Sequence, residues 1–364
     1  MKRNHFALTA LATALALAQT SALATNGYFM TGYGFRSQGM GVGIAYGTDS
    51  LSIVANPANI VNTGMRGDMG VGFFNAKRFV RAGSYAQDNP NINNPGFGFD
   101  GATTSLRDWF IMPEMGMTMP LTESLHAGIA FVPNGGSTVY PYNYFSYNAV
   151  TPDVPGKGAT LGGDLMQLLV PITVGYKINE NHSVGAALDV AAQRFRMYGL
   201  GSFKTFSSTF GVPISSDYDH LTNNGFDYSY GAGIKVGYLG DFLEDKLSIG
   251  LSYTSRTYMT KFDKYKGLFA EQGDFDIPAN YGIGVAFKPK KNLVIAVDVS
   301  RIQWSSVAAL GNRGREPLLA WRIPVRGKIM RLVGYPPSMI PHLLPVTITV
   351  WVLAGKIRPS INWG

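Results

Sequence analysis

The side chains that could act as nucleophiles or bases are few and scattered along the chain. The 364 residues include no cysteine and five histidines, which are His5, His126, His182, His220 and His342. A Ser-His-acid triad needs a histidine beside a serine and a carboxylate, and the G-x-S-x-G nucleophile motif does not occur. His182 falls in a predicted turn, His220 in a predicted loop, and His126 on a predicted strand among apolar neighbours. We therefore expect no enzyme active site.

Positive side chains are the remaining groups that could bind a charged ligand. Lys157, Arg194, Arg196 and Lys204 lie in or near segments predicted as loops, and Arg196 is our candidate contact for a ligand carboxylate. The same residues could instead be solvated loop charges or contacts to phosphate. No set of His, Asp and Glu residues has the spacing of metal ligands, so we predict neither a metal site nor a cofactor.

The basic charge of the chain is concentrated near its C-terminal end. The formal net charge is +8, but from Arg313 onward there are eight Lys or Arg residues and a single acid, Glu316. The first 312 residues hold 23 basic and 22 acidic groups. A nearly neutral body does not attract polyanions, so we expect no nucleic acid partner.

The N-terminus has the pattern of an export signal. Lys2 and Arg3 precede a short apolar run from Phe6 to Ala18, and Ala22-Leu23-Ala24 fits an A-x-A cleavage site. The run is shorter than the roughly 20 apolar residues that a membrane-spanning helix needs. We therefore expect residues 1–24 to be a signal peptide and the exported chain to begin at Thr25.

Apolar residues alternate with small or polar residues in about nine segments, which predicts the fold class. The alternation is clear in six segments and weaker in three more: 167–177, 183–193, 227–238, 246–254, 280–287 and 292–300, then 68–78, 108–119 and 124–132. The chain also has 44 Gly, 19 Tyr and 21 Phe, but only 15% charged residues. An exported chain with this pattern is expected to be all-β and to form a transmembrane antiparallel β-barrel.

The second face of these segments distinguishes a membrane barrel from a soluble β-sandwich. A sandwich normally has a charged outer face, whereas here the second face consists mostly of Gly, Ser, Thr and Asn. Small inward residues suit a narrow lumen that is filled by a plug. The alternatives are a general porin or adhesin, which would want an open and charged lumen, and an outer-membrane lipase, which would need the triad sought above.

The predicted connections between strands alternate in length. Connections near 179–181, 240–245 and 289–291 are short, and we expect them to be periplasmic turns. Those at 79–107, 133–166, 195–226 and 256–278 are long, and we expect them to be extracellular loops. The long ones are rich in Phe, Tyr and Asn, which serve either loop packing or the capture of an apolar ligand.

Two segments interrupt the regular pattern. Residues 25–60 are too rich in glycine and too irregular in period for a helix or a long strand, so we predict a compact plug in 25–64 and the barrel in 65–312. In Phe131–Gly136, Pro133 lacks a ladder donor, and Gly135 with Gly136 permits a bend. This second segment is either a strand end or a kink that opens a gap in the barrel wall.

Four motifs in the plug segment resemble the N-terminal hatch of the FadL/TodX outer-membrane transporters: Asn26-Gly27-Tyr28-Phe29, Gly39-Met40-Gly41-Val42-Gly43, Asp49-Ser50-Leu51 and Asn56-Pro57-Ala58. The stretch from Lys261 to Gly284 is similar to the family pattern as well. The resemblance extends from about Thr25 to Asn312.

The resemblance implies a 14-stranded barrel, plugged by the hatch, in the cell outer membrane of a Gram-negative bacterium. It implies passive uptake of hydrophobic molecules, with long-chain fatty acids as the first ligand class and aromatic hydrocarbons as the alternative. Ligand would be captured on extracellular loops, move to an internal site and leave sideways through the wall. The residues implied in binding or gating are Phe29, Asn56, Pro57 and Ala58 of the hatch, and Pro133, Gly135 and Gly136 of the kink.

The expected partners follow from the same resemblance. They are a hydrophobic small molecule, outer-membrane lipid and lipopolysaccharide, and the barrel-assembly machinery. Lys157, Arg194, Arg196 and Lys204 could meet lipopolysaccharide phosphate. We expect a monomer.

The family pattern ends near Asn312. The segment 313–364 is rich in Arg and Pro, and we recognise no barrel alternation or closing strand in it. Codons for Val352–Gly364, VLAGKIRPSINWG, can give GFGWKDQTVYKLG when read one base over, which resembles the family. We predict a frameshifted tail, with a divergent C-terminus as the alternative.

A frameshift would leave nine or ten of the 14 strands and a barrel that is incomplete at the C-terminus. Unclosed edges leave backbone N–H and C=O groups in hydrocarbon at several kcal/mol each. We therefore expect an open barrel that does not insert stably, and the chain as written could be a non-functional copy.

Overall fold

Nine long strands form where the sequence alternates, which confirms the all-β prediction. The computed structural model describes residues 25–82, 101–140, 160–200, 215, 217–290, 293–311, 322–325, 328–331 and 346–354. The predicted signal peptide and most of the tail lie outside these residues. The nine strands are β3 (Arg66–Asn75), β6 (Trp109–Pro120), β7 (Leu125–Tyr140), β8 (Leu161–Asn179), β9 (His182–Tyr198), β10 (Asp227–Phe242), β11 (Leu247–Thr254), β13 (Asn280–Lys290) and β14 (Leu293–Ile302).

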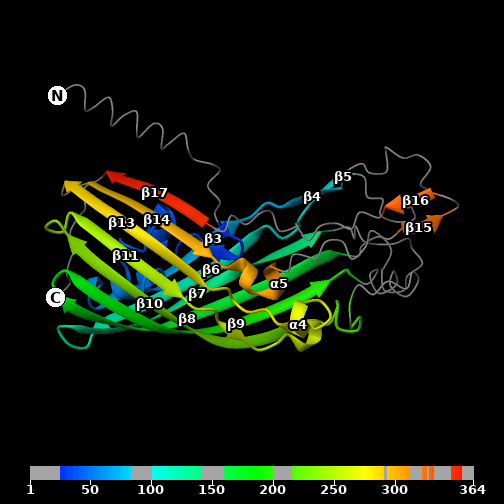
Figure 1. Ribbon diagram of the computed structural model, residues 1–364, viewed down its shortest axis with the longest axis horizontal. Helices are drawn as coiled ribbons and strands as arrows, with labels where there is room; N and C mark the ends of the chain where they lie inside the picture. Colours follow the sequence, from blue (N-terminus) through cyan, green and yellow to red (C-terminus); the bar gives the residue numbers. More distant parts are fainter. Residues whose placement is uncertain are drawn as a thin grey trace, which may run out of the picture.

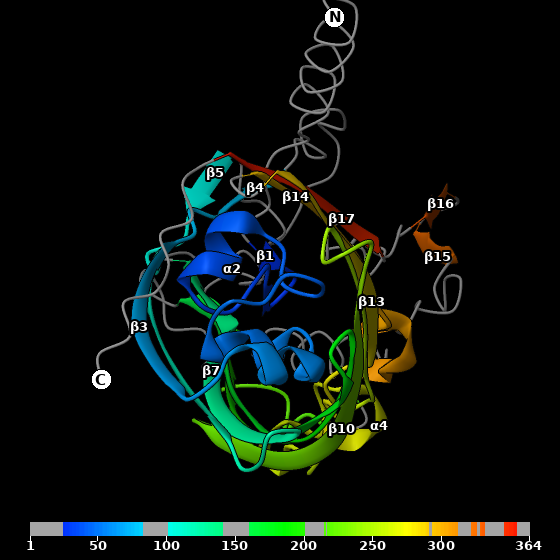
Figure 2. The same ribbon diagram turned by 90° about the vertical axis from the view of Figure 1, so that its left-hand side faces the viewer.

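These strands form one antiparallel sheet that curls into a barrel wall (Figures 1 and 2). The order is β17-β14-β13-β11-β10-β9-β8-β7-β6-β3, and the two-residue strand β12 (Tyr258–Met259) pairs with β10 beyond the end of β11. Each strand therefore pairs with its neighbours in the chain, as in an up-and-down barrel. Two separate hairpins pair β4 (Phe79–Ala82) with β5 (Gly101–Thr104) and β15 (Arg322–Val325) with β16 (Lys328–Arg331).

The prediction that the tail holds no barrel strand is wrong for one segment. β17 (Val346–Ala354) pairs with β14 in antiparallel register, from Val346 opposite Arg301 to Ala354 opposite Leu293. Its first five residues, Val-Thr-Ile-Thr-Val, are all β-branched, and such residues fit an extended backbone. Among the described residues no pairing joins β17 to β3, so the sheet is open between these two edges.

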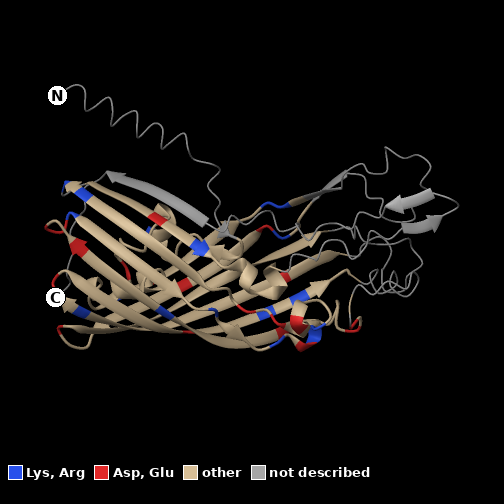
Figure 3. Cartoon of the chain, in the orientation of Figure 1, with Lys and Arg blue, Asp and Glu red and all other residues tan. Residues whose placement is uncertain are grey.

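The two faces of the sheet have the polarity of a membrane barrel. Large apolar residues are exposed on the outside, for example Ile172 at 48%, Ile234 at 57% and Leu251 at 46%. Their neighbours on the other face, such as Thr173 and Lys235, are buried. An outer surface of this kind suits hydrocarbon rather than water, which answers the sandwich alternative. Figure 3 places Lys, Arg, Asp and Glu mainly near the two ends of the barrel.

Short and long connections lie at opposite ends of the barrel (Figure 1). The short turns include 121–124, 180–181 and 243–246. One long connection is shorter than predicted, because β7 continues through Pro133 to Tyr140 and β8 begins at Leu161. The strand interruption predicted at Phe131–Gly136 is therefore wrong for the β7–β8 side, where Pro133 pairs with Leu168 and Gly135 with Met166.

The N-terminal segment lies inside the curled sheet (Figure 2). We call residues 25–64 the hatch. It contains β1 (Thr25–Asn26), β2 (Phe29–Met30), α2 (Phe35–Met40), η1 (Ser50–Val54) and η2 (Pro57–Asn62). Four short helices lie in the connections near the long-loop end: η3 (Asp263–Tyr265), α4 (Ala270–Gly273), η4 (Trp304–Ser306) and α5 (Ala308–Gly311). In the described part of the chain, none of the helices is both long and apolar enough to span a bilayer.

Candidate functional site: hatch, wall and aromatic cluster

The Asn-Pro-Ala motif turns the hatch and ties it to the wall. Asn56 is the N-cap of η2, and its Oδ1 accepts from the Ala58 backbone nitrogen at 3.0 Å. Its Nδ2 donates to the carbonyl of Ile44 in the hatch at 2.9 Å and to the carbonyl of Tyr238 on β10 at 3.0 Å. Pro57 stands at the start of η2, where its missing N–H costs nothing. Asn56, Pro57 and Ala58 therefore form part of the contact between the hatch and the wall, and all three are buried.

Glycines on the inner face of the wall make room for the hatch backbone. A Cβ at Gly185 of β9 would lie 2.6 Å from the Ala58 nitrogen, and one at Gly237 of β10 would lie 2.8 Å from Pro57 Cδ. Both distances are shorter than a real Cβ contact. Close approaches to hatch residues, in part to their side chains, occur on five other strands, at Gly116, Gly128, Gly175, Gly250 and Gly284. We call these seven residues the glycine notches.

Buried carboxylates on the wall hold backbone amides of the hatch. Asp298 on β14 accepts from the nitrogens of Gly43 at 2.7 Å and Ile44 at 2.9 Å. Glu114 on β6 accepts from the Gly34 nitrogen at 3.0 Å and from Gln38 at 3.1 Å. Bonds from N–H groups to a carboxylate are about twice as strong as neutral hydrogen bonds, so these acids fix two separate points of the hatch.

A second pair of charged residues anchors the middle of the hatch. Asp68 on β3 accepts from the nitrogen and hydroxyl of Ser50, both at 2.8 Å, and pairs with Arg66 at 2.6 Å. Lys235 on β10 donates to the carbonyl of Val54 at 2.8 Å and lies 3.5 Å from Asp189. None of these anchors was singled out from the sequence. The sequence feature that could have identified them is a single charged residue at an inward-facing position of a barrel strand.

The ladder between β6 and β7 ends part-way along the wall. β6 pairs with β7 from Pro120–His126 to Met115–Phe131, while β3 stays paired with β6 up to Asn75–Trp109. Beyond Phe131, β8 is the one ladder partner of β7 among the residues that the structure describes, until Leu106 donates to the Val139 carbonyl at 2.7 Å. We call the stretch from Val132 to Thr138, opposite the outer half of β6, the β6–β7 break.

The predicted kink residues explain this break. The Gly135 nitrogen donates to the Tyr28 carbonyl of the hatch at 3.1 Å instead of to a strand. Alternate residues of an antiparallel strand direct their N–H groups to the same side, so Pro133 lacks a donor on that side as well. Gly135 has φ +137°, and a Cβ there would clash with the Leu165 carbonyl. Gly136 has room for a Cβ, with Arg78 Nη1 nearest at 3.7 Å.

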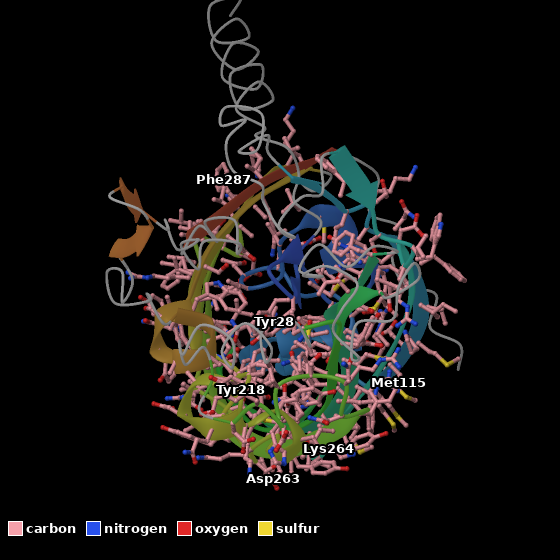
Figure 4. The ribbon with its side chains drawn as sticks, turned by 90° about the vertical axis from the view of Figure 1, so that its right-hand side faces the viewer. Tyr28, Met115, Tyr218, Asp263, Lys264 and Phe287 are labelled. Atoms are coloured by element: carbon pink, nitrogen blue, oxygen red, sulfur yellow. The ribbon has the colours of Figure 1, made fainter. Side chains whose placement is uncertain are left out.

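An aromatic cluster covers the hatch beside this break. Tyr28 stacks on Phe29 with ring centroids 4.9 Å apart, and the Trp304 ring meets Tyr28 edge-on at 5.1 Å. Phe275 lies 6.2 Å from Tyr28 and continues the cluster. Farther rings belong to the same contacts: Phe195, Phe262, Tyr265 and Phe269. Viewed from the long-loop end, Tyr28 lies inside the ring of strands, whereas Met115 and Phe287 lie on the wall (Figure 4).

Phe29 was predicted as a binding or gating residue, and it is buried in this aromatic cluster. Trp304 was missed because it lies just beyond the last alternating segment. Burial raises the pKa of the Tyr28 hydroxyl well above its usual range, although hydrogen bonding with the Gln167 side chain acts in the opposite direction. The hydroxyl is therefore protonated near neutral pH.

Arg196, the predicted carboxylate contact, is engaged with other groups at the outer end of β9. Its guanidinium lies 4.3 Å from the Phe226 ring centroid and 3.5 Å from Asp164. Arg194 lies 4.1 Å from the same ring. Arg107 also pairs with Asp164, at 2.8 Å. The other two candidates, Lys157 and Lys204, lie outside the described residues.

The described histidines lie in three separate places. His126 is buried on β7, as predicted. His182 begins β9, and its Nδ1 is 2.7 Å from the Tyr238 hydroxyl. His220 lies in the β9–β10 connection, with Nδ1 2.8 Å from Asp217. Within the described residues, no three His, Asp or Glu side chains are grouped as metal ligands would be.

Comparison with known proteins gives a family and a shared fold. The profile of the family described as "Outer membrane protein transport protein (OMPP1/FadL/TodX)" matches residues 9–323. The chain is similar to the structure of the P. putida toluene transporter TodX, with 17% identity and a TM-score of 0.55, over 76% of this chain and 72% of that one.

A TodX deltaS2S3 mutant, described as a monoaromatic hydrocarbon channel, gives 15% identity and a TM-score of 0.55 over 76% and 71% of the two chains. No individually curated protein sequence matches. At this level of identity, the structural matches establish the fold.

Proposed function

Since the chain belongs to the outer membrane protein transport family (OMPP1/FadL/TodX), whose members transport hydrophobic compounds across the Gram-negative outer membrane, we propose that it takes up such compounds passively and releases them sideways. The observation that carries the proposal is the β6–β7 break, because the hatch reaches the wall there. The Tyr28 carbonyl binds Gly135 at 3.1 Å, and the Tyr33 hydroxyl donates to Asn134 at 2.7 Å.

Sideways release keeps an apolar ligand out of water. A ligand that crossed a wet lumen would expose its carbon chain at about 0.8 kcal/mol per CH₂. At the break, the Gly135 bond to the hatch stands where a β6–β7 ladder bond would otherwise run, and the Asn134 side chain accepts from the Tyr33 hydroxyl and the Met30 nitrogen. Displacement of residues 28–33 would remove all three bonds and connect the aromatic cluster to the outside of the wall.

The aromatic cluster favours aromatic ligands over long-chain fatty acids, which the sequence prediction placed first. Rings stack well on Tyr28, Phe29 and Trp304. A fatty acid carboxylate would need a free cation, but the described candidate Arg196 shares the buried Asp164 with Arg107. Arg194, which stacks on Phe226, is the better candidate for a contact to lipopolysaccharide phosphate at the outer end of the wall. We further propose that the protein acts as a monomer.

The test is uptake by a transporter-null Gram-negative strain that expresses the full chain. Cells in which the chain is found assembled in the outer membrane would receive labelled toluene or labelled oleate, and we expect toluene uptake above the empty-vector level with little gain for oleate. Oleate uptake alone would restore the fatty acid assignment. No gain for either ligand would refute the proposal.

A substitution at Pro133 tests the exit route. Pro133→Val restores a backbone donor at the break, so we expect slower toluene uptake with the barrel still assembled. Pro289→Val makes the same change on β13, away from the break, and serves as the matched control. Equal uptake by the two variants would mean that the ligand leaves elsewhere.

A further inference from the structure

Two arginines continue the outward-facing row of β9 beyond its apolar part. Along this row Leu188 and Val190 are exposed on the outside of the wall, and Arg194 and Arg196 follow with the same period of two. Phe195, between the two arginines, is buried on the inner face. The two arginines therefore face the membrane and not the hatch.

The length of β9 places Arg194 at the level of the lipid head groups. Arg194 comes twelve residues after His182, which begins β9 beside a short turn. At roughly 3.3 Å per residue this is about 40 Å along the strand, and the usual tilt of barrel strands reduces it to a height of about 30 Å. The apolar band of such barrels is about 25 Å tall. Arg194 therefore lies just beyond that band, at the long-loop end, which faces the cell exterior in outer-membrane barrels.

Arg194 has no carboxylate partner among the residues that the structure describes. Its guanidinium lies 4.1 Å from the Phe226 ring centroid, and its Nη2 donates to the sulfur of Met166, a weak acceptor, at 2.8 Å. Its neighbours across the ladders are Met166 on β8 and Tyr228 on β10, and both are uncharged. The adjacent Asp227 belongs to the other face of β10. A cation beside hydrocarbon is costly without a counterion, so this position suits an anion supplied by the membrane.

Two further guanidinium groups next to Arg194 share a single carboxylate. Asp164 lies opposite Arg196 in the β8–β9 ladder. Its Oδ2 lies 3.5 Å from Arg196 and 2.8 Å from Arg107. Arg196 also lies 4.3 Å from the centroid of the Phe226 ring that Arg194 contacts. Three positive groups and one negative group leave a net charge of +2 on the outer face of the wall, and Figure 3 shows basic residues on the strands near this end.

We propose that this surface binds the phosphorylated sugar head of lipopolysaccharide. We call it the outer basic patch, and its residues are Arg107, Asp164, Arg194, Arg196, Phe226 and Tyr228. This inference develops the contact proposed above for Arg194, and it does not depend on which compound the protein takes up.

The chemistry of the outer basic patch matches a phosphate on a lipid. The planar guanidinium group binds two phosphate oxygens at once, and the shared Phe226 ring holds Arg194 and Arg196 side by side for this purpose. Below them, the exposed Leu168, Val190 and Tyr230 can contact acyl chains. Lipopolysaccharide carries a phosphate at each end of its lipid A disaccharide, which suits a net charge of +2 better than a phospholipid with one phosphate does.

Three lipid probes test the patch: lipid A with both phosphates, lipid A with both phosphates removed, and phosphatidylglycerol. Binding of each to the full chain, purified and folded in a non-ionic detergent, would be measured by native mass spectrometry. We expect the phosphorylated lipid A to bind at least about tenfold more tightly than the other two, because one hydrogen bond between charged groups has about that effect.

Variants at Arg194 identify the phosphate contact. Arg194→Gln removes the charge without breaking an ion pair, and it should weaken binding of phosphorylated lipid A about tenfold while leaving the dephosphorylated form unchanged. Arg194→Lys keeps the charge but not the fork of donors, and its affinity should lie between the two. Arg301→Gln is the matched control, because Arg301 is an exposed arginine on the outward row of β14, outside the patch.

The outcomes separate this inference from the proposed function. Equal binding of the two forms of lipid A, or equal affinities for Arg194→Gln and Arg301→Gln, would overturn the site. Phosphatidylglycerol bound as tightly as phosphorylated lipid A would mean a surface for anionic lipids in general, and the assignment to lipopolysaccharide would be wrong. If Arg194→Lys bound no better than Arg194→Gln, the loss would come from packing and not from charge, which also overturns the phosphate contact. Since no transported compound is used, a failure of toluene uptake would leave these results unchanged.

Discussion

A methyl group added at Gly185 tests how the wall holds the hatch. Its Cβ would lie 2.6 Å from the Ala58 nitrogen and closer still to the Pro57 carbonyl. Both partners are backbone atoms of the buried Asn-Pro-Ala turn, so no side-chain rotation can relieve the clash. Overpacking of this kind costs about 1–3 kcal/mol.

The clash raises the free energy of the state in which the hatch is packed against the wall, and it does not affect the state in which the hatch is displaced. The ratio of displaced to seated hatch should therefore rise by roughly 5- to 150-fold in Gly185→Ala. Hydrogen exchange of the backbone amides in η1 and η2 would report this directly, because displaced residues lose protection. Gly67→Ala on β3 is the control, since a Cβ there has no neighbour nearer than 4.0 Å.

Equal exchange rates in η1 and η2 for Gly185→Ala and Gly67→Ala would refute the reasoning. So would faster exchange across the whole barrel, because that would mean a weakened wall and not a displaced hatch. Protection of the β9 and β10 amides is therefore measured in the same experiment.

Three further predictions concern the hatch, the outer loops and the tail. Asp298→Ala should speed exchange of the two hatch amides that it binds, each bond being worth about 1.5–3 kcal/mol, while Asp298→Asn keeps one acceptor and should have a smaller effect. The His220 hydrogen bond holds the pKa of Asp217 below its usual range. Protection of the His220 amide should therefore persist from pH 7 to about pH 5 and decrease below about pH 4. If the same decrease in protection occurred in Asp217→Asn, this explanation would be wrong. Sequencing the gene across codons 310–364 should reveal a missing or extra base, and stop codons in the alternative frame would exclude the frameshift.

The strands were predictable because both faces of a membrane barrel follow a period of two. Apolar residues on the lipid side and small residues on the hatch side leave that period readable even in the weaker segments, such as 68–78. The Asn-Pro-Ala turn was equally accessible, since its chemistry is local: Asn56 caps the helix that Pro57 begins.

Features that depend on distant partners were not predictable in this way. Pro133 and Gly135 indicated a break but not its side, because only the register with β6 and β8 shows which neighbour is lost. The anchors Glu114 and Asp298 looked like isolated acids until the hatch amides appeared beside them. β17 was missed because its β-branched run follows a long stretch rich in Arg and Pro.

The seating of the hatch also constrains the order of assembly. The hatch is among the first segments of the chain, yet the Gly43 amide binds Asp298, which lies 255 positions later. Contacts at such separation form late, because a long loop must close before they can contribute. The glycine notches also extend over seven strands, from β6 to β13. The earliest part of the chain can therefore reach its place only after nearly the whole wall has curled, so a seated hatch reports that the wall is complete as far as β14.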